Sequence, residues 1–379
     1  MQLSRFVWIF PLSGLLPAAD QQLEVQPLPL ADSDRPGDLT LKLSAYNQQD
    51  NGGIEQVDED ASVFEAVILA RKQITDTGTL SLRALGDVVS AASIERAHNA
   101  DWQAQQGGAS GNYRVGLGGG WSEQGDQVDW RIGVQFAAEY AYLSSGANAG
   151  VTWNLPGRNT ALSADLQVFM DTVDLIRFNG DEEGSEARDT YTLDLGWQQV
   201  LTPYDLLSLS LSHTEQSGFL ATSYNSVFTP TSEYSEELPD SRSRTALTTR
   251  WRHSFGTDSA GEIGARYYTD DWGLSAVTLD VRYSHYLLGR RLLLEPTYRL
   301  HVQQAAKYYR ESFIEPLSEY RTSDPDLGDF IGHMVGLKAG FLGGSLFGYK
   351  ADWDVSLFAY DRDNGLSAFW VIIGQRVEF

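Results

Sequence analysis

Charged residues recur at alternate positions between residues 244 and 303. Side chains two apart in a β-strand point to the same face, so each segment would carry its charges on one side. Across a water-filled space, arginines that face acids create a transverse field that orients polar or anionic solutes. The alternative is that the charges form inter-strand ion pairs that fill a narrow interior. The candidate pore-lining residues are Arg250, Arg252, Glu262, Arg266, Asp280, Arg282, Glu295 and Arg299.

A second set of polar residues lies where connections between segments are expected. Asp270 and Asp271 follow one alternating segment, and Arg321 and Asp324 fall in the long connection 304–332. We interpret the paired acids and Arg321 as a latch that folds this connection into the mouth of the structure, with ligand capture as the alternative. The stretch 303–313 has residue types typical of a short helix.

Catalytic patterns are absent from the sequence. None of the six histidines has a serine two residues later, the spacing that a barrel phospholipase uses to activate its nucleophile. His98 with Glu95 is a weak counterpart of a protease site at a barrel rim. There is no H-x-x-x-H spacing, phosphate loop or haem motif. We therefore predict no enzymatic activity and no cofactor.

Metal and thiol chemistry are disfavoured by composition. The chain has no cysteine, which excludes disulfides, thiolate metal sites and a cysteine nucleophile. The acids of segment 55–60 do not match a calcium loop, because Ser62 stands where a further acid is needed after Asp58 and Asp60. A solvated loop is the better interpretation there, and we predict no resident metal.

The overall charge is strongly negative. The sequence has 28 basic and 51 acidic residues, a formal net charge of −23, which disfavours binding to nucleic acid. Acids and bases nearly balance at the alternating positions, so the negative excess is expected in loops. Such loops could contact lipopolysaccharide through divalent cations.

The elements that must position these residues are β-strands. In one example, Trp130, Ile132, Val134 and Phe136 alternate with polar or small residues. No apolar run after the N-terminal segment approaches the roughly 20 residues of a membrane-spanning helix. Sixteen segments alternate in this way, with fourteen or eighteen as the alternatives: 38–47, 62–72, 78–90, 110–121, 127–142, 147–155, 160–171, 189–200, 205–215, 244–254, 260–270, 275–287, 292–303, 333–343, 350–361 and 366–379.

The lengths of the connections test this count. Every connection after an even segment is short, and the long ones, near 48–61, 91–109, 172–188, 216–243 and 304–332, all follow odd segments. Bacterial outer-membrane barrels have short periplasmic turns and long external loops. The pattern predicts an all-β fold, a transmembrane antiparallel up-and-down barrel of about sixteen strands with a periplasmic N-terminus.

Two further features favour a membrane barrel over a soluble β-sandwich. Aromatic residues cluster toward segment ends, as membrane-interface girdles require. The last segment ends on Phe379, which resembles the signal that the barrel assembly machinery reads in the outer membrane of Gram-negative bacteria. Residues 1–19, with apolar residues and Pro17-Ala18-Ala19, are typical of a signal peptide. We predict a periplasmic leader over 20–37 and the barrel over 38–379.

A family resemblance covers the later part of the chain. Its residues are SRTALTTRWRH, ARYYTDDWGLSAVTLDVRY, YRLHVQQAAKYYRESF and YRTSDPDLGDF, strongest over 242–330, with a weaker extension back to GGGWSEQGDQVDW and EYAYLSSG. Through them the chain resembles a proteobacterial family of outer-membrane proteins catalogued as a domain of unknown function. The resemblance implies neighbouring genes for a small lipoprotein, a thioredoxin-like protein and a flavin transferase, and hence a redox-linked pathway.

Two functions are compatible with these observations. The first is a porin-like channel or export conduit for a small polar solute, because sixteen strands enclose room for water whereas about eight are filled by side chains. The second is a structural or docking barrel that houses a periplasmic lipoprotein or redox partner.

Overall fold

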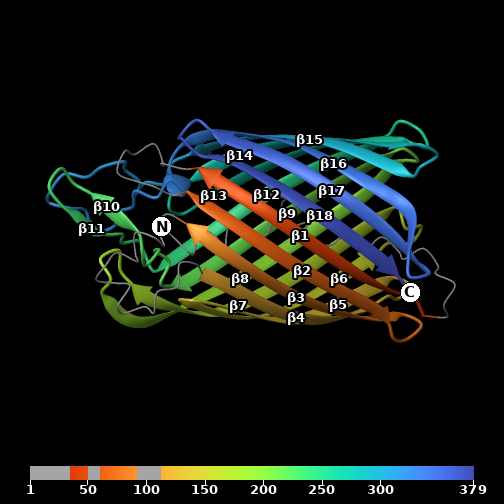
Figure 1. Cartoon of the computed structure of the whole chain (residues 1–379), viewed down its shortest axis with the longest axis horizontal. Coiled ribbons are helices and arrows are strands. Elements are labelled where there is room, and N and C mark those ends of the chain that lie inside the picture. The colour runs from red at the N-terminus through yellow and green to blue at the C-terminus, as the bar shows by residue number, and fades with distance from the viewer. Residues whose placement is uncertain (1–34, 50–59, 92–111) are drawn as a thin grey trace.

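The computed structural model describes residues 35–49, 60–91 and 112–379. Sixteen antiparallel strands close into one barrel, in the order β1-β18-β17-β16-β15-β14-β13-β12-β9-β8-β7-β6-β5-β4-β3-β2 (Figure 1). The barrel strands are β1 (Gly37–Gln49), β2 (Ala61–Gln73), β3 (Gly78–Ala91), β4 (Asn112–Glu123), β5 (Val128–Glu139), β6 (Tyr142–Asn154), β7 (Thr160–Ile176), β8 (Glu182–Thr202), β9 (Asp205–Gly218), β12 (Ser241–Ser254), β13 (Ser259–Asp270), β14 (Ser275–Leu287), β15 (Leu292–Gln304), β16 (Phe330–Leu346), β17 (Tyr349–Arg362) and β18 (Ser367–Glu378).

Two small elements lie outside the barrel wall. Strands β10 (Ser226–Phe228) and β11 (Glu233–Ser235) form a separate hairpin. A single turn of 3-10 helix, η2 (Pro325–Leu327), begins after Asp324, whose side chain accepts a hydrogen bond from the Asp326 N–H. In the described part of the chain, no helix is long and apolar enough to cross a membrane.

The alternation of side chains produces an apolar belt around the barrel. Each of the sixteen wall strands carries large apolar side chains that are exposed, such as Leu117 at 67% and Val134 at 52%. An exposed apolar surface that encircles the molecule is stable only in hydrocarbon, and a closed barrel leaves no backbone edge unpaired there. The prediction of a sixteen-stranded antiparallel membrane barrel is confirmed.

The first and last strands close the barrel with matched backbone and charge contacts. Gly37 N–H donates to the Phe379 carbonyl (2.7 Å), and Phe379 N–H donates to the Gly37 carbonyl (2.9 Å). Asp38 is fully buried and pairs with Arg71 of β2 (Nε to Oδ1, 3.0 Å) and with Arg376 of β18 (Nε to Oδ2, 3.5 Å). One carboxylate thus joins three strands at the seam.

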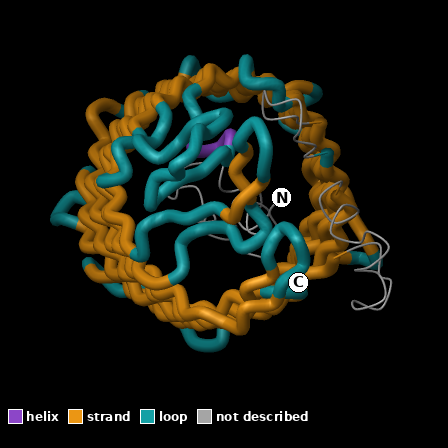
Figure 2. The backbone as a smooth tube through the Cα atoms, turned by 90° about the vertical axis from the view of Figure 1, so that its left-hand side faces the viewer, coloured by secondary structure: helices purple, strands orange, loops and turns teal. Residues whose placement is uncertain are grey.

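The connections differ at the two ends of the barrel. The links after β2, β4, β6, β8, β12, β14 and β16 are all tight turns, as the connection lengths predicted. At the opposite end, the β9–β12 loop (219–240, which contains β10 and β11) and the β15–β16 loop (305–329) extend beyond the strands (Figure 1). We call these two loops together the cap. The end-on view shows loops crossing the barrel opening (Figure 2).

Three local predictions were wrong. Residues 172–188 form no long loop, because β7 and β8 continue pairing to Ile176 and Glu182 across a bulge. The turn between β5 and β6 occupies only residues 140–141, so the fifth strand ends earlier than the alternation indicated.

Segment 303–313 is not helical. Gln303 belongs to β15, and beyond it backbone groups bond to other segments, including Ala306 N–H to the Leu327 carbonyl (2.8 Å) and Lys307 N–H to the Trp272 carbonyl (2.9 Å). These tertiary hydrogen bonds outweigh the weak helix propensity of the sequence.

The predicted signal peptide over 1–19 and most of the leader over 20–37 lie outside the described residues, as do parts of the connections 48–61 and 91–109.

Candidate functional site

The predicted charged residues lie together on one wall of the barrel, on β12 to β15. Direct register partners are Arg252 with Glu262 and Glu262 with Arg282, while Asp280 is opposite Arg299. Their strand neighbours Trp251, Ile263 and Val281 are exposed apolar residues of the belt, at 44%, 52% and 46%. Since successive side chains point to opposite faces, the charged residues occupy the inner face.

Three ion pairs link these strands. Arg299 Nε lies 2.6 Å from Asp280 Oδ1, and Arg282 Nε lies 3.7 Å from Glu295 Oε1. Arg252 contacts the Glu262 carboxylate, and Ser284 Oγ donates to Glu295 (2.6 Å). The inter-strand pairing that the sequence offered as an alternative is therefore present.

The pairing leaves a positive excess on this wall. The eight candidates comprise five arginines and three acids, and each acid already has an arginine partner. Arg266 instead lies against the Tyr268 ring, 5.6 Å from its centroid. The Arg252 side chain is the most accessible of the three paired arginines at 37%, against 24% for Arg282 and 6% for Arg299. The wall therefore combines a buried ion pair, Arg299 with Asp280, with a solvent-accessible arginine, Arg252.

Hydroxyl groups line the inner face next to the arginines. On β9, Ser208 and Ser210 alternate with belt residues Leu209 and Leu211, and Ser208 is the register partner of Arg250. Serine hydroxyls both donate and accept hydrogen bonds. An arginine wall beside a serine wall suits a polar solute that carries negative charge.

An aromatic cluster occupies another part of the inner face, on β1, β17 and β18, with Met334 of β16 packed beside it. Trp370 is 2% exposed and stacks on Phe358 at 5.1 Å, and Tyr46 lies 5.9 Å from Trp370. Tyr224 of the β9–β12 loop packs against this cluster. Sequence reasoning missed this cluster, because these strands carry aromatic residues on both faces. Only the pairing between strands determines which aromatic side chains meet.

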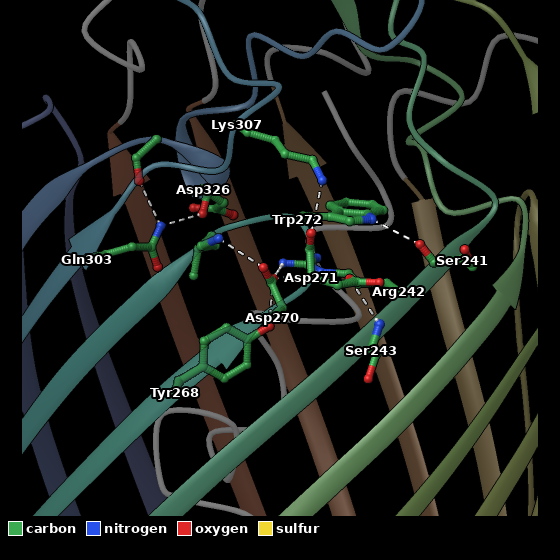
Figure 3. Close-up of polar contacts among 12 residues, drawn as sticks. Ser241, Arg242, Ser243, Tyr268, Asp270, Asp271, Trp272, Gln303, Lys307 and Asp326 are labelled. Carbon is green, nitrogen blue, oxygen red and sulfur yellow. Dashed lines mark hydrogen bonds and ion pairs between the residues drawn. The ribbon is translucent and has the colours of Figure 1, made fainter.

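The predicted paired acids Asp270 and Asp271 anchor the end of β13 (Figure 3). Asp270 accepts hydrogen bonds from Arg242 Nε (2.9 Å) and the Tyr268 hydroxyl (3.1 Å). Asp271 Oδ1 accepts from the Ser243 N–H (3.1 Å), and Lys307 Nζ donates to its carbonyl (3.0 Å). The cation paired with the Asp270 carboxylate is thus Arg242, and Lys307 binds the main chain of Asp271.

Trp272, which the sequence did not single out, is the centre of this anchor. It is 2% exposed, donates from Nε1 to the Ser241 carbonyl (2.9 Å), and has the Arg242 guanidinium 4.2 Å from its ring centroid. Apolar residues of both cap loops pack around it: Leu220, Leu238, Ala306, Tyr308 and Leu327. The two loops therefore share one small core on the barrel rim.

The β15–β16 loop is also tied to the wall through Asp326. Arg362 Nη1 of β17 lies 2.6 Å from Asp326 Oδ1, and Gln303 Nε2 donates to the Asp326 carbonyl (2.8 Å). Loop anchoring, one of the two interpretations of this region, thus has direct contacts.

Arg321 and Asp324 contribute at a different place from Asp270 and Asp271. Arg321 and Glu237 exchange backbone hydrogen bonds of 2.7 and 3.1 Å, which join the two cap loops edge to edge. The Arg321 guanidinium donates to the Ser318 carbonyl (3.0 Å) and to the Glu319 carbonyl (3.2 Å). The predicted latch between Arg321 and the paired acids is wrong, because loop pairing directs this arginine elsewhere.

Asp324 belongs to a buried polar cluster that the sequence did not reveal. Glu236, Asn225 and Thr322 are 1%, 4% and 0% exposed. Thr322 Oγ1 donates to Glu236 Oε1 (2.5 Å), and Asn225 Nδ2 donates both to Glu236 (3.3 Å) and to Asp324 (3.4 Å). Burial, reinforced by the neighbouring Asp324 carboxylate, raises the pKa of Glu236 to about 7.

Metal ligation has no counterpart in the part of the chain that the structure describes. There, no three or more His, Cys, Asp or Glu side chains are grouped so that they could hold an ion.

A closed barrel with an apolar belt and a charged inner wall defines an integral β-barrel protein of the outer membrane. Within that class, the family model described as "Protein of unknown function (DUF3570)" matches residues 13–376, and the chain belongs to this family. The resemblance seen in the sequence is confirmed. No curated protein matches the chain.

Solved structures match the chain at low sequence identity. OccK1 (OpdK) of Pseudomonas aeruginosa has 10% identity and a TM-score of 0.46, over 91% of this chain and 98% of that one. A structure described as a bacterial polysaccharide outer membrane secretin has 10% identity and a TM-score of 0.49, over 90% and 98%. OpdQ of Pseudomonas aeruginosa has 9% identity and a TM-score of 0.44, over 92% and 99%.

Proposed function

We propose that this protein is a non-enzymatic outer-membrane channel or export conduit for a small polar solute. The observation that carries the proposal is the inner wall of β12–β15, where seven arginines face inward with four acids, beside the serines of β9. Structural ion pairs alone need equal numbers of the two charges, whereas the surplus of arginine attracts anionic groups. We expect the solute to carry a carboxylate or another negative group.

Planar-bilayer conductance tests this function. The purified protein should give a steady unitary current, and a salt gradient should give a reversal potential that favours anions. Arg252→Gln, at the accessible arginine, should shift the reversal potential toward cations. Arg290→Gln is the matched control, because Arg290 lies in the β14–β15 turn with 59% of its side chain exposed. Absence of current, or an equal shift in both variants, would refute the proposal.

A second candidate function is a docking barrel for a periplasmic lipoprotein or redox protein. Two apolar side chains at the tight-turn end favour it: Phe347 is 91% exposed and Leu288 is 75% exposed, both with φ of 52°. Bulky residues seldom adopt this backbone conformation. Copurification of one stoichiometric lipoprotein, lost in Phe347→Ser/Leu288→Ser, would support docking. A steady current from the protein alone would refute a docking barrel whose interior is closed to ions.

The remaining partners follow from the membrane location. We propose that outer-membrane lipid covers the apolar belt, that lipopolysaccharide meets the long-loop end, and that the barrel assembly machinery reads the strand that ends on Phe379. In this arrangement the tight turns and the N-terminus face the periplasm.

A further inference from the structure

The two cap loops meet around two acidic side chains that are buried together. Glu236 comes from the β9–β12 loop and Asp324 from the β15–β16 loop, and they are 1% and 8% exposed. A single amide group, Asn225 Nδ2, donates to both carboxylates. The loops are also paired directly beside them, through the backbone bridge of Glu237 and Arg321. The acidic pair therefore lies at the joint of the cap.

The hydrogen bonds to Glu236 from the described residues come from neutral donors, and they favour its ionised form less than burial and the neighbouring Asp324 carboxylate oppose it. Its Oε2 accepts from the Thr222 N–H (2.7 Å), and its Oε1 accepts from Thr322 and Asn225. Among the described ion pairs none includes Glu236. A buried carboxylate without a cation is stable when it carries a proton, and costly when it is ionised beside a second carboxylate.

Charged groups on the packed segments do not supply that cation. Arg321 directs its guanidinium to the carbonyls of Ser318 and Glu319, and Arg310 directs its guanidinium to the Tyr309 carbonyl. Arg362 is paired with Asp326. Glu237 adds another acid next to Glu236 in sequence. Asp324 is the titratable group that acts most strongly on Glu236.

We propose that Glu236, with Asp324 beside it, forms a proton-operated latch: the proton on Glu236 keeps the two cap loops joined, and its loss places two carboxylates at the joint, separates the loops and opens the cap. The latch regulates entry to the channel proposed above, but the joining of the loops does not depend on conduction.

The direction of the response follows from the raised pKa of Glu236. Protonation stabilises the joined loops, so this contribution is fully present below the ordinary pKa of 4.5 and is lost as pH rises through about 7. The cap should be closed in mild acid and loosened in mild base.

Distance measurements between the loops test the latch. The chain contains no cysteine, so Thr231→Cys and Ser312→Cys, both at exposed positions, give one spin label on each loop. In the whole barrel in nanodiscs, the distance distribution should be narrow at about pH 5.5 and broader or longer at about pH 8.5. Its midpoint should lie near pH 7, because burial raises the pKa of Glu236 to about 7.

Three variants assign the response. Glu236→Gln should keep the distribution narrow at both pH values, because an amide cannot ionise. Asp324→Asn should lower the midpoint by about one pH unit or more, because it removes the neighbouring negative charge. Glu319→Gln removes an exposed acid of the same loop and should leave the midpoint unchanged.

Two results would overturn the latch: a pH-independent distribution in the labelled parent, or an unaltered pH response in Glu236→Gln. If Glu236→Gln fails to assemble, an unshifted midpoint in Asp324→Asn refutes the latch by itself. The channel is judged separately. A cap that responds to pH in a protein without current would refute the channel but not the latch. Current in a protein whose cap does not respond to pH would refute the latch but not the channel.

Discussion

The guanidinium of Arg242 lies 4.2 Å from the ring centroid of Trp272, and its Nε donates to Asp270 (2.9 Å). One arginine therefore joins the start of β12 to the end of β13 and covers the tryptophan on which both cap loops pack. This contact therefore contributes both to the stability of the cap and to the stability of the barrel wall.

Removing Trp272 should loosen the cap and spare the barrel. Trp272→Ala should destabilise the joined loops by about 3–5 kcal/mol, the usual cost of deleting a buried tryptophan. Hydrogen exchange over 219–240 and 305–329 should rise, while exchange in the β14 ladder stays at the parent level. Trp272→Phe keeps most of the packing but loses the hydrogen bond to the Ser241 carbonyl. It should therefore destabilise the joined loops by about 1 kcal/mol, much less than Trp272→Ala does.

Breaking the ion pair of Arg299 and Asp280 should be costlier than deleting it. Asp280→Leu leaves Arg299 buried without its partner, and we expect a loss of about 3–5 kcal/mol in unfolding free energy. The double variant Arg299→Met/Asp280→Leu should recover most of that loss, since no lone charge remains. Urea unfolding from lipid vesicles measures both. A double variant that is as unstable as the single one would contradict this account.

Glycine at position 336 provides space for the aromatic cluster. A Cβ there would overlap the Phe358 ring, whereas at Gly340 on the same strand face it would be 3.4 Å from Leu293 Cβ, an ordinary contact. Gly336→Ala should cost about 1–3 kcal/mol and alter the near-ultraviolet signal of the Phe358–Trp370 stack. Gly340→Ala is the matched control and should change stability by less than about 0.5 kcal/mol.

Phe379 should matter for assembly through its side chain. Phe379→Ala retains both backbone hydrogen bonds to Gly37 but loses the ring that contacts Tyr349 and lies 5.1 Å from Lys72 Nζ. We expect less folded barrel in outer-membrane fractions, measured by heat-modifiable gel mobility, and degradation of the rest. Tyr349→Ala removes the same ring contact from the other side and should assemble normally. Efficient export of the Phe379 variant as a soluble protein would argue against an outer-membrane barrel signal.

Strand number and pairing could be predicted from the sequence because alternation and connection length are local properties. Segments such as Val277, Leu279 and Val281 show their lipid face directly. Each of the sixteen wall strands overlaps its predicted range, and β8 departs most, because it begins at Glu182 and not at residue 189. The charged wall was also predictable, since its arginines and acids share the parity opposite to that face.

The cap was not predictable in the same way. Glu236, Asn225 and Thr322 have no common spacing, and they meet only because two loops separated by the whole of β12–β15 fold against each other. Trp272 looked like one of many aromatic residues near a strand end. Long-range loop packing leaves no periodic trace in a single sequence.

The seam at Asp38 has a consequence for how the barrel is made. In the native register Asp38 touches Arg71 on one neighbour and Arg376 on the other. If the last strand slipped by one residue, each of its side chains would change faces, and Arg376 would point into lipid while Asp38 lost one of its two cations. The Asp38 carboxylate thus favours the native register when the barrel closes. A barrel whose ends joined out of register would retain an unbalanced buried charge, and this would raise its free energy.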